Sequence, residues 1–94
     1  MGVSVKICGL NTPEAAEAAL KVRADFGGLV FFPKSPRHVR LEEARALASI
    51  LRGRIRIVTL MVDPDDAAVD EVVAAIAPDL IQLHRSEEHT SELQ

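Results

Sequence analysis

The sequence predicts a parallel α/β sheet whose strands and helices follow one another in the order βαβαβαβ. Short apolar runs alternate with amphipathic segments about ten residues long, and the loops that join them are short. Strands separated by helices of this kind pair in parallel through right-handed crossovers. The pattern alone fits both a doubly wound sheet and half of a (β/α)8 barrel.

The first half of the chain predicts two strands with one helix between them. Val3–Ile7 is a short apolar run. A helix is expected over Pro13–Arg23, because Thr12 suits the N-cap and proline suits the first helical position. Phe26–Phe32 is a continuous apolar run, which is typical of a parallel strand covered on both faces. The apolar face of the helix is expected to consist of Ala15, Ala16, Ala19, Leu20 and Val22.

The second half predicts two further helices and two further strands. Leu41–Leu51 carries an apolar stripe and is followed by Gly53, which favours a helix end. Ile55–Val62 predicts the third strand, Ala67–Ile76 the third helix and Leu80–Leu83 the fourth strand. The inward face of the third helix is expected to consist of Val69, Val72, Val73 and Ile76.

Composition narrows the class of protein. The chain has 94 residues, which is enough for one small domain, and its net charge of -3 argues against a nucleic-acid partner. A single cysteine excludes a disulfide framework or a cysteine-rich zinc site and suits a reducing compartment. Because no signal peptide or membrane-spanning run is evident, we expect a cytoplasmic protein without a membrane partner.

Polar residues follow the predicted strands, at the sheet edge where α/β proteins bind ligands. Cys8 precedes a helix N-terminus, which favours the reactive thiolate, although a small core residue would look the same. Arg37 lies in a proline-restricted basic loop and suits a carboxylate or phosphate, or else it is solvated. Asp63 before proline favours a turn, and His84 at a strand end is readily solvated.

Two further patterns argue against other sites. A glycine-rich phosphate-binding fingerprint is absent from the sequence, which weakens a nucleotide-binding interpretation. Arg52, Arg54 and Arg56 lie around Gly53, at the opposite end of the third strand from the candidate residues. We expect this cluster to form a solvated turn.

Three motifs resemble the phosphoribosylanthranilate isomerase family of tryptophan biosynthesis. They are KICGLNTPEAA at Lys6–Ala16, GLVFFPKSPRHV at Gly28–Val39 and DLIQLH at Asp79–His84. The resemblance implies that residues 1–84 are the N-terminal half of a (β/α)8 TIM barrel, a fold of roughly twice this length or more. It also implies an Amadori rearrangement of N-phosphoribosylanthranilate to the carboxyphenylamino-deoxyribulose phosphate, without metal or organic cofactor.

The same resemblance assigns roles to three residues. Cys8 matches the general base, which removes a proton from the ribose carbon next to a protonated Schiff base. Arg37 matches a residue that holds the anthranilate part of the substrate, and His84 matches a position close to the active site. The family takes its general acid and its phosphate site from later strands. We therefore expect this chain alone to be inactive and prone to association, and the full-length protein to be a monomer or homodimer.

The sequence changes character at Arg85. Arg85–Gln94, RSEEHTSELQ, resembles the translation of a sequencing adapter, so residues 85–94 are expected to be a non-native tail.

Two other kinds of protein are alternatives to the isomerase family. One alternative is a non-catalytic flavodoxin-like binding module, which would place acidic residues where Cys8–Asn11 stands. Another is a different phosphosugar barrel enzyme, such as an indoleglycerol-phosphate synthase or an epimerase, which uses other residues at the first strand end.

Overall fold

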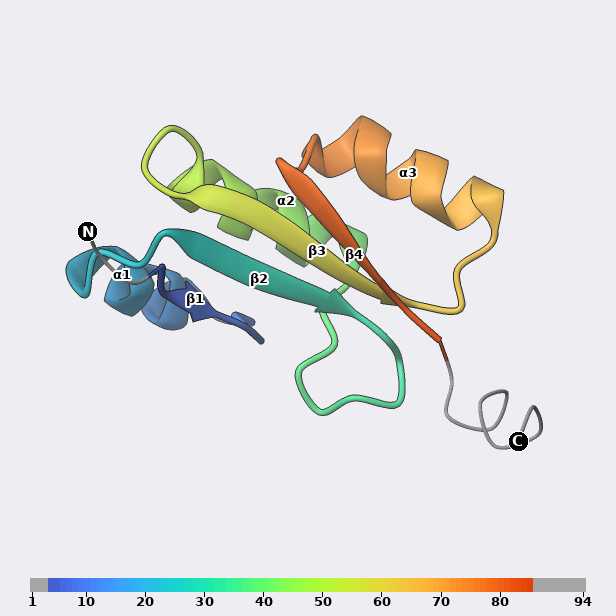
Figure 1. Ribbon diagram of the computed structural model, residues 1–94, viewed down its shortest axis with the longest axis horizontal. Helices are drawn as coiled ribbons and strands as arrows, with labels where there is room; N and C mark the ends of the chain where they lie inside the picture. The colour runs from blue at the N-terminus through green and yellow to red at the C-terminus, as the bar shows by residue number, and fades with distance from the viewer. Residues whose placement is uncertain (1–3, 86–94) are drawn as a thin grey trace.

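The computed structural model describes residues 4–85 and contains a four-stranded parallel sheet with three helices (Figure 1). The elements are β1 Lys6–Ile7, α1 Pro13–Lys21, β2 Phe26–Phe31, α2 Leu41–Leu51, β3 Arg56–Val62, α3 Asp66–Ile76 and β4 Leu80–His84. This confirms the predicted order. Within residues 4–85, no helix has the length and apolar character needed to cross a membrane.

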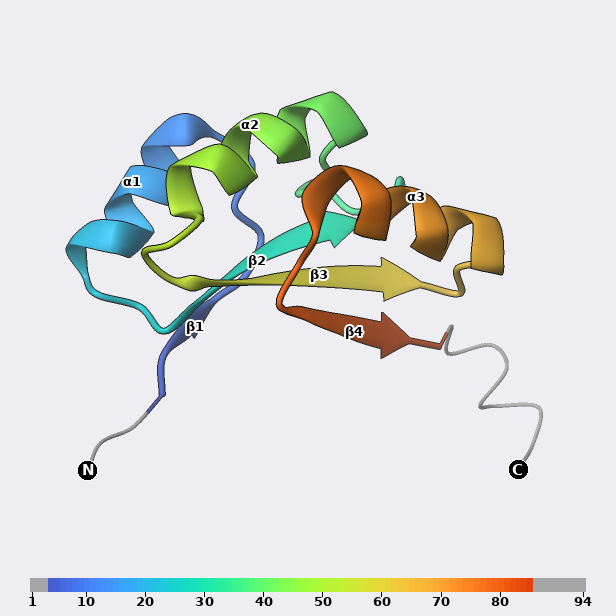
Figure 2. The same cartoon turned by 90° about the horizontal axis from the view of Figure 1, so that it is seen from above.

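The three helices all lie on one face of the sheet (Figure 2). The strands follow the sheet in chain order, β1-β2-β3-β4. When every crossover is right-handed and each strand pairs with the one before it, each helix returns over the same face. A flavodoxin-like sheet places its first strand inside the sheet, whereas β1 lies at an edge here. The winding is therefore that of a (β/α)8 barrel.

The main core fills the space between the sheet and the helices. Leu29 of β2 and Ile57 of β3 point into it and are fully buried, as are Leu51 of α2 and Ile76 of α3. Burial of each such side chain contributes about 1.5–3 kcal/mol of transfer free energy. The alternate residues of the strands therefore point to the other face.

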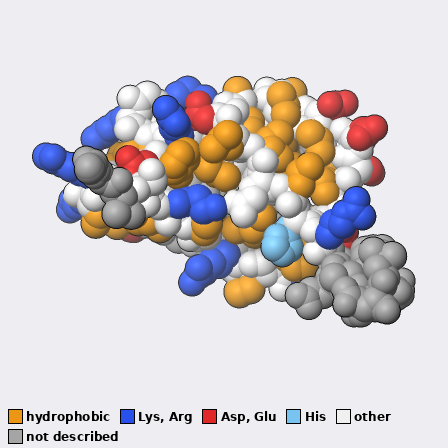
Figure 3. All heavy atoms as spheres, viewed as in Figure 1, with side chains coloured by type: hydrophobic (Ala, Val, Ile, Leu, Met, Phe, Trp, Pro, Cys, Tyr) orange, Lys and Arg blue, Asp and Glu red, His pale blue; other side chains and the backbone are white. Residues whose placement is uncertain are grey.

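Within residues 4–85, no helix lies over that other face. The register aligns Gly28, Val58 and Leu80 in one row across it, and Leu80 is 50% exposed. Figure 3 views the molecule from this side and shows hydrophobic side chains gathered over the strands. Lys6 of β1 donates a hydrogen bond from Nζ to Oε1 of Gln82 on β4, at 2.7 Å. We call this surface the uncovered face of the sheet.

Two helix faces differ from the expectation. Val22 is 62% exposed, because α1 ends at Lys21 and the chain turns at Arg23, whose φ is 59°. Val73 of α3 is 44% exposed, whereas Val72 and Ile76 are buried as expected. The buried stripe of each helix is thus narrower than its apolar residues suggest.

The first strand is also shorter than predicted. Only Lys6–Ile7 of the described residues forms β1, whereas Val5 bonds to the turn before β2. Its N–H donates to a carboxylate oxygen of Asp25 at 2.7 Å, and its carbonyl accepts from the Asp25 N–H at 2.8 Å.

Arg52 corrects the expectation of a solvated arginine turn. Its guanidinium donates hydrogen bonds to the backbone carbonyls of Ile76 and Ala77, the latter at 3.3 Å. These carbonyls end α3, and a helix C-terminus attracts a cation. Arg52 therefore joins the end of α2 to the end of α3.

Candidate active site

Two loops meet along one edge of β2, at the carboxyl end of the sheet. The N–H of Leu10, in the loop after β1, donates to the carbonyl of Gly28 at 3.0 Å. The N–H of Val39, in the loop after β2, donates to the carbonyl of Val30, also at 3.0 Å. Carbonyls two residues apart point to the same side of a strand. The first loop therefore bonds to this edge of β2 at Gly28, and the second loop bonds to the same edge two residues further on, at Val30.

Cys8 lies in the first of these loops and is exposed. It sits against the backbone of Gly28, because a Cβ atom at that position would lie 3.2 Å from Cα and 3.3 Å from Sγ of Cys8. Gly28 belongs to the uncovered face. The thiol is therefore accessible, and it lies at the carboxyl end of the sheet on the side where a closed barrel has its interior.

Arg37 lies in the second loop, and its side chain packs on Gly9. A Cβ atom on Gly9 would overlap Cδ of Arg37 and would lie 3.0 Å from its Nη1 atom. Gly9 has a φ of 78°, which glycine adopts without strain. The fold thus brings Arg37 next to the residue that follows Cys8, although Arg37 lies 29 positions after Cys8 in the sequence.

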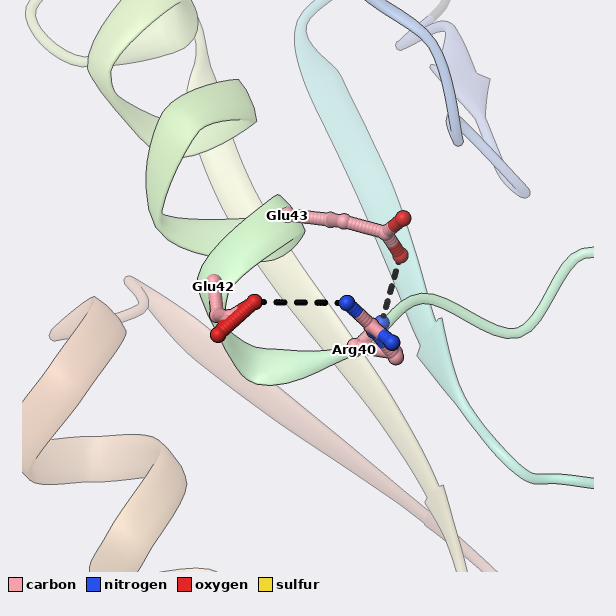
Figure 4. Close-up of polar contacts among 3 residues, drawn as sticks. All are labelled: Arg40, Glu42 and Glu43. Carbon is pink, nitrogen blue, oxygen red and sulfur yellow. Dashed lines mark hydrogen bonds and ion pairs between the residues drawn. The ribbon is translucent and has the colours of Figure 1, made fainter.

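Local hydrogen bonds fix the loop that carries Arg37. The Arg37 N–H donates to Oγ of Ser35 at 3.0 Å, and the Arg40 N–H donates to Oε1 of Glu43 at 2.9 Å where α2 begins (Figure 4). The ion pair between Arg40 and Glu42 spans 3.4 Å between exposed side chains, so it adds little. Backbone bonds and the helix start, rather than surface charge, hold this loop in place.

His84 does not join Cys8 and Arg37. It is the last residue of β4, it is exposed, and its carbonyl accepts a hydrogen bond from the N–H of Asp63 at 3.0 Å. β2 and β3 lie between β4 and β1. Asp63 occupies the expected turn after β3, with a φ of 48°. His84 therefore lies at the same end of the sheet but on its opposite edge.

Sequence reasoning missed a groove beside these loops. A cavity of about 560 Å³ lies between the N-terminal ends of α2 and α3, and its walls include His38, Arg40 and Glu71. Nδ1 of His38 is buried there, and it has no hydrogen-bond partner within residues 4–85. Nothing in the local sequence singles out His38, which directly follows Arg37 in the same loop. In the part of the chain that the structure describes, no three His, Cys, Asp or Glu side chains are grouped to hold a metal.

Comparison with known proteins decides the family. The sequence model of N-(5'-phosphoribosyl)anthranilate (PRA) isomerase matches residues 5–94. The chain belongs to this family. The PRA isomerase of Azorhizobium caulinodans is 58% identical over 87 residues, which are 93% of this chain and 38% of that protein. The Bradyrhizobium enzyme is 52% identical over 93% of this chain and 40% of its own length. The chain thus spans about 40% of these curated relatives.

Solved PRA isomerase structures confirm the barrel. The Thermotoga maritima enzyme superposes with a TM-score of 0.84 at 30% identity, covering 98% of this chain and 46% of that one. A PRA isomerase in complex with reduced 1-(o-carboxyphenylamino)-1-deoxyribulose 5-phosphate gives the same TM-score and covers 48% of that chain. The expected half of a (β/α)8 barrel is therefore correct. The tail expected at residues 85–94 lies outside the described residues except for Arg85, and it stays a prediction.

Proposed function

We propose that the complete protein to which these residues belong is a PRA isomerase in which Cys8 is the general base and Arg37 binds the anthranilate carboxylate. The observation that carries this proposal is the meeting of the two loops along β2, which places the Arg37 side chain on Gly9, directly after Cys8. A base and a cationic anchor that the fold brings close together suit a substrate that carries a carboxylate near its reacting carbon.

Cys8 has the accessibility that proton transfer needs. Ring opening of the phosphoribosyl group leaves a protonated Schiff base, which acidifies the C–H bond of the neighbouring ribose carbon. The Cys8 thiolate accepts that proton, and the C–H electrons form the carbon–carbon double bond of an enolamine, which then becomes the ketone. A positioned base of this kind contributes typically about 10²–10⁴-fold to rate.

Arg37 is suited to hold the carboxylate. Its side chain is exposed, and within residues 4–85 its guanidinium pairs with no carboxylate of the protein. A guanidinium donates two parallel hydrogen bonds to a carboxylate, which fixes the plane of the bound group as well as its position. An anthranilate held in this way would present its substituted nitrogen, and with it the ribose, toward Cys8.

The rest of the family's site lies beyond these residues. We place His84 at the rim of the substrate site, on the opposite edge of this half-sheet. The general acid and the phosphate site would come from later strands, so we propose that the 94-residue chain has no isomerase activity by itself. The complete protein would work in the cytoplasm, as a monomer or a homodimer. One Thermotoga maritima relative is described as dimeric.

A chimera tests the proposal. Residues 1–84 of this chain replace the matching part of the Azorhizobium caulinodans relative, which is 58% identical over this region. The chimera should restore growth without tryptophan to a bacterial strain that lacks PRA isomerase, whereas the 94-residue chain should not. A folded chimera without PRA isomerase activity would contradict the proposal.

A further inference from the structure

Gly9 and Gly53 share a backbone conformation but differ in their surroundings. Their φ angles are 78° and 81°, which residues other than glycine adopt only with strain. A Cβ atom on Gly53 would meet nothing within 4 Å. A Cβ atom on Gly9 would overlap Cδ of Arg37 and would lie 3.0 Å from Nη1 and 3.3 Å from Nε. A turn explains Gly53 fully, whereas Gly9 also makes room for a particular side chain.

The backbone of Arg37 has little freedom to move away from Gly9. Its N–H is bonded to Ser35, and two residues later the Val39 N–H is bonded to β2. On the other side, Leu10 directly follows Gly9 and is bonded to Gly28. Both loops are thus tied to the same strand. A side chain on residue 9 would therefore displace the Arg37 side chain rather than separate the loops.

We propose that Gly9 is a positioning residue, whose missing side chain forms the slot that keeps the guanidinium of Arg37 beside the Cys8 thiol. The catalytic consequence rests on the proposed function: the slot would set the carboxylate anchor relative to the base. Replacing Gly9 with alanine would leave both groups in the protein but would change their relative placement.

Charge-selective alkylation tests the slot without using isomerase activity. Cys8 is the only cysteine in the 94-residue chain, so modification reports on this thiol alone. The ratio of the rates with anionic iodoacetate and neutral iodoacetamide is independent of the thiolate fraction, and a nearby positive charge raises it. At low salt, Arg37→Ala should lower this ratio by about two- to threefold, the effect of one charge through a largely aqueous path.

Gly9→Ala should lower the ratio as much as Arg37→Ala does, whereas Gly53→Ala should leave it unchanged. Gly53→Ala is the matched control, because it carries the same backbone strain without a neighbour. An unchanged ratio in Gly9→Ala, next to a lowered ratio in Arg37→Ala, would overturn the proposal. An unchanged ratio in Arg37→Ala would also overturn it, because the guanidinium would then not lie beside the thiol.

A second measurement covers the case in which Gly9→Ala unfolds the protein. In the chimera, Gly9→Ala should shift the midpoint of urea unfolding further than Gly53→Ala does. When both substitutions are made in a chimera that already carries Arg37→Ala, the two shifts should be equal. If Gly9→Ala shifts the midpoint by the same amount with and without Arg37→Ala, that result would contradict the proposed slot. Gly9→Ala should also raise KM at least tenfold, with little further effect after Arg37→Ala. An inactive unsubstituted chimera would contradict the proposed function, while the alkylation ratios would still decide on Gly9.

Discussion

Lys6 and Gln82 join the first and last strands of the sheet by a hydrogen bond of 2.7 Å between Nζ and Oε1. The bond crosses the uncovered face of the sheet, and both residues are exposed. It lies among apolar side chains of Phe26, Val58 and Leu80, which line a cavity of about 300 Å³. Two polar side chains thus lie on the same surface as apolar side chains that would be buried in a closed barrel.

This surface predicts that the 94-residue chain associates. Leu80 is 50% exposed on the uncovered face, and within residues 4–85 both edge strands, β1 and β4, have a partner strand on one side only. Sedimentation velocity should show species larger than a monomer, and a hydrophobic dye should bind. The chimera, in which later strands cover this face, is the control. A sharply melting monomer that binds no dye would contradict this expectation.

Arg37→Ala in the chimera should raise KM by roughly ten- to a hundredfold, since hydrogen bonds to charged groups contribute about 1.5–3 kcal/mol. Arg37→Lys should recover only part of the loss, because an ammonium group cannot form the parallel pair of bonds. Steady-state kinetics on PRA would measure both. Unchanged KM in both variants would remove Arg37 from substrate binding.

Gly28→Ala and Gly27→Ala should separate a site effect from a packing effect. A Cβ atom on Gly28 would press on Cys8, so this variant should lower kcat with little loss of stability. A Cβ atom on Gly27 would lie 3.1 Å from Leu10, Leu51 and Ile55 in the main core. Gly27→Ala should therefore destabilise the chimera by about 1–3 kcal/mol through overpacking. The reverse pattern in kinetics and urea unfolding would refute this division.

Arg52→Ala should destabilise the chimera by about 1 kcal/mol, because two carbonyls at the end of α3 lose a cationic donor. Arg54→Ala is the matched control, since it removes an exposed arginine from the same turn. Chemical denaturation would measure the difference. Equal effects of the two substitutions would mean that Arg52 does not stabilise α3.

Local pattern predicted most of the elements but not their closest contacts. Apolar periodicity located α2 at Leu41–Leu51 with both ends correct, because a leucine and alanine stripe and the following Gly53 mark it. Periodicity alone did not choose between the two windings, since that choice depends on strand order. The packing of Arg37 on Gly9 also escaped it, because this contact depends on how two loops align along β2. Arg52 was misjudged for the same reason, as its partners lie 24 and 25 residues away.

Turnover of the chimera carrying Cys8→Ala decides whether Cys8 is the base of a PRA isomerase. Cys8 is exposed, so its substitution should leave the unfolding midpoint close to that of the parent chimera. We predict that kcat falls by about 10²–10⁴-fold, the usual contribution of a positioned general base. A kcat close to that of the parent, in a protein of unchanged stability, would contradict the role of Cys8.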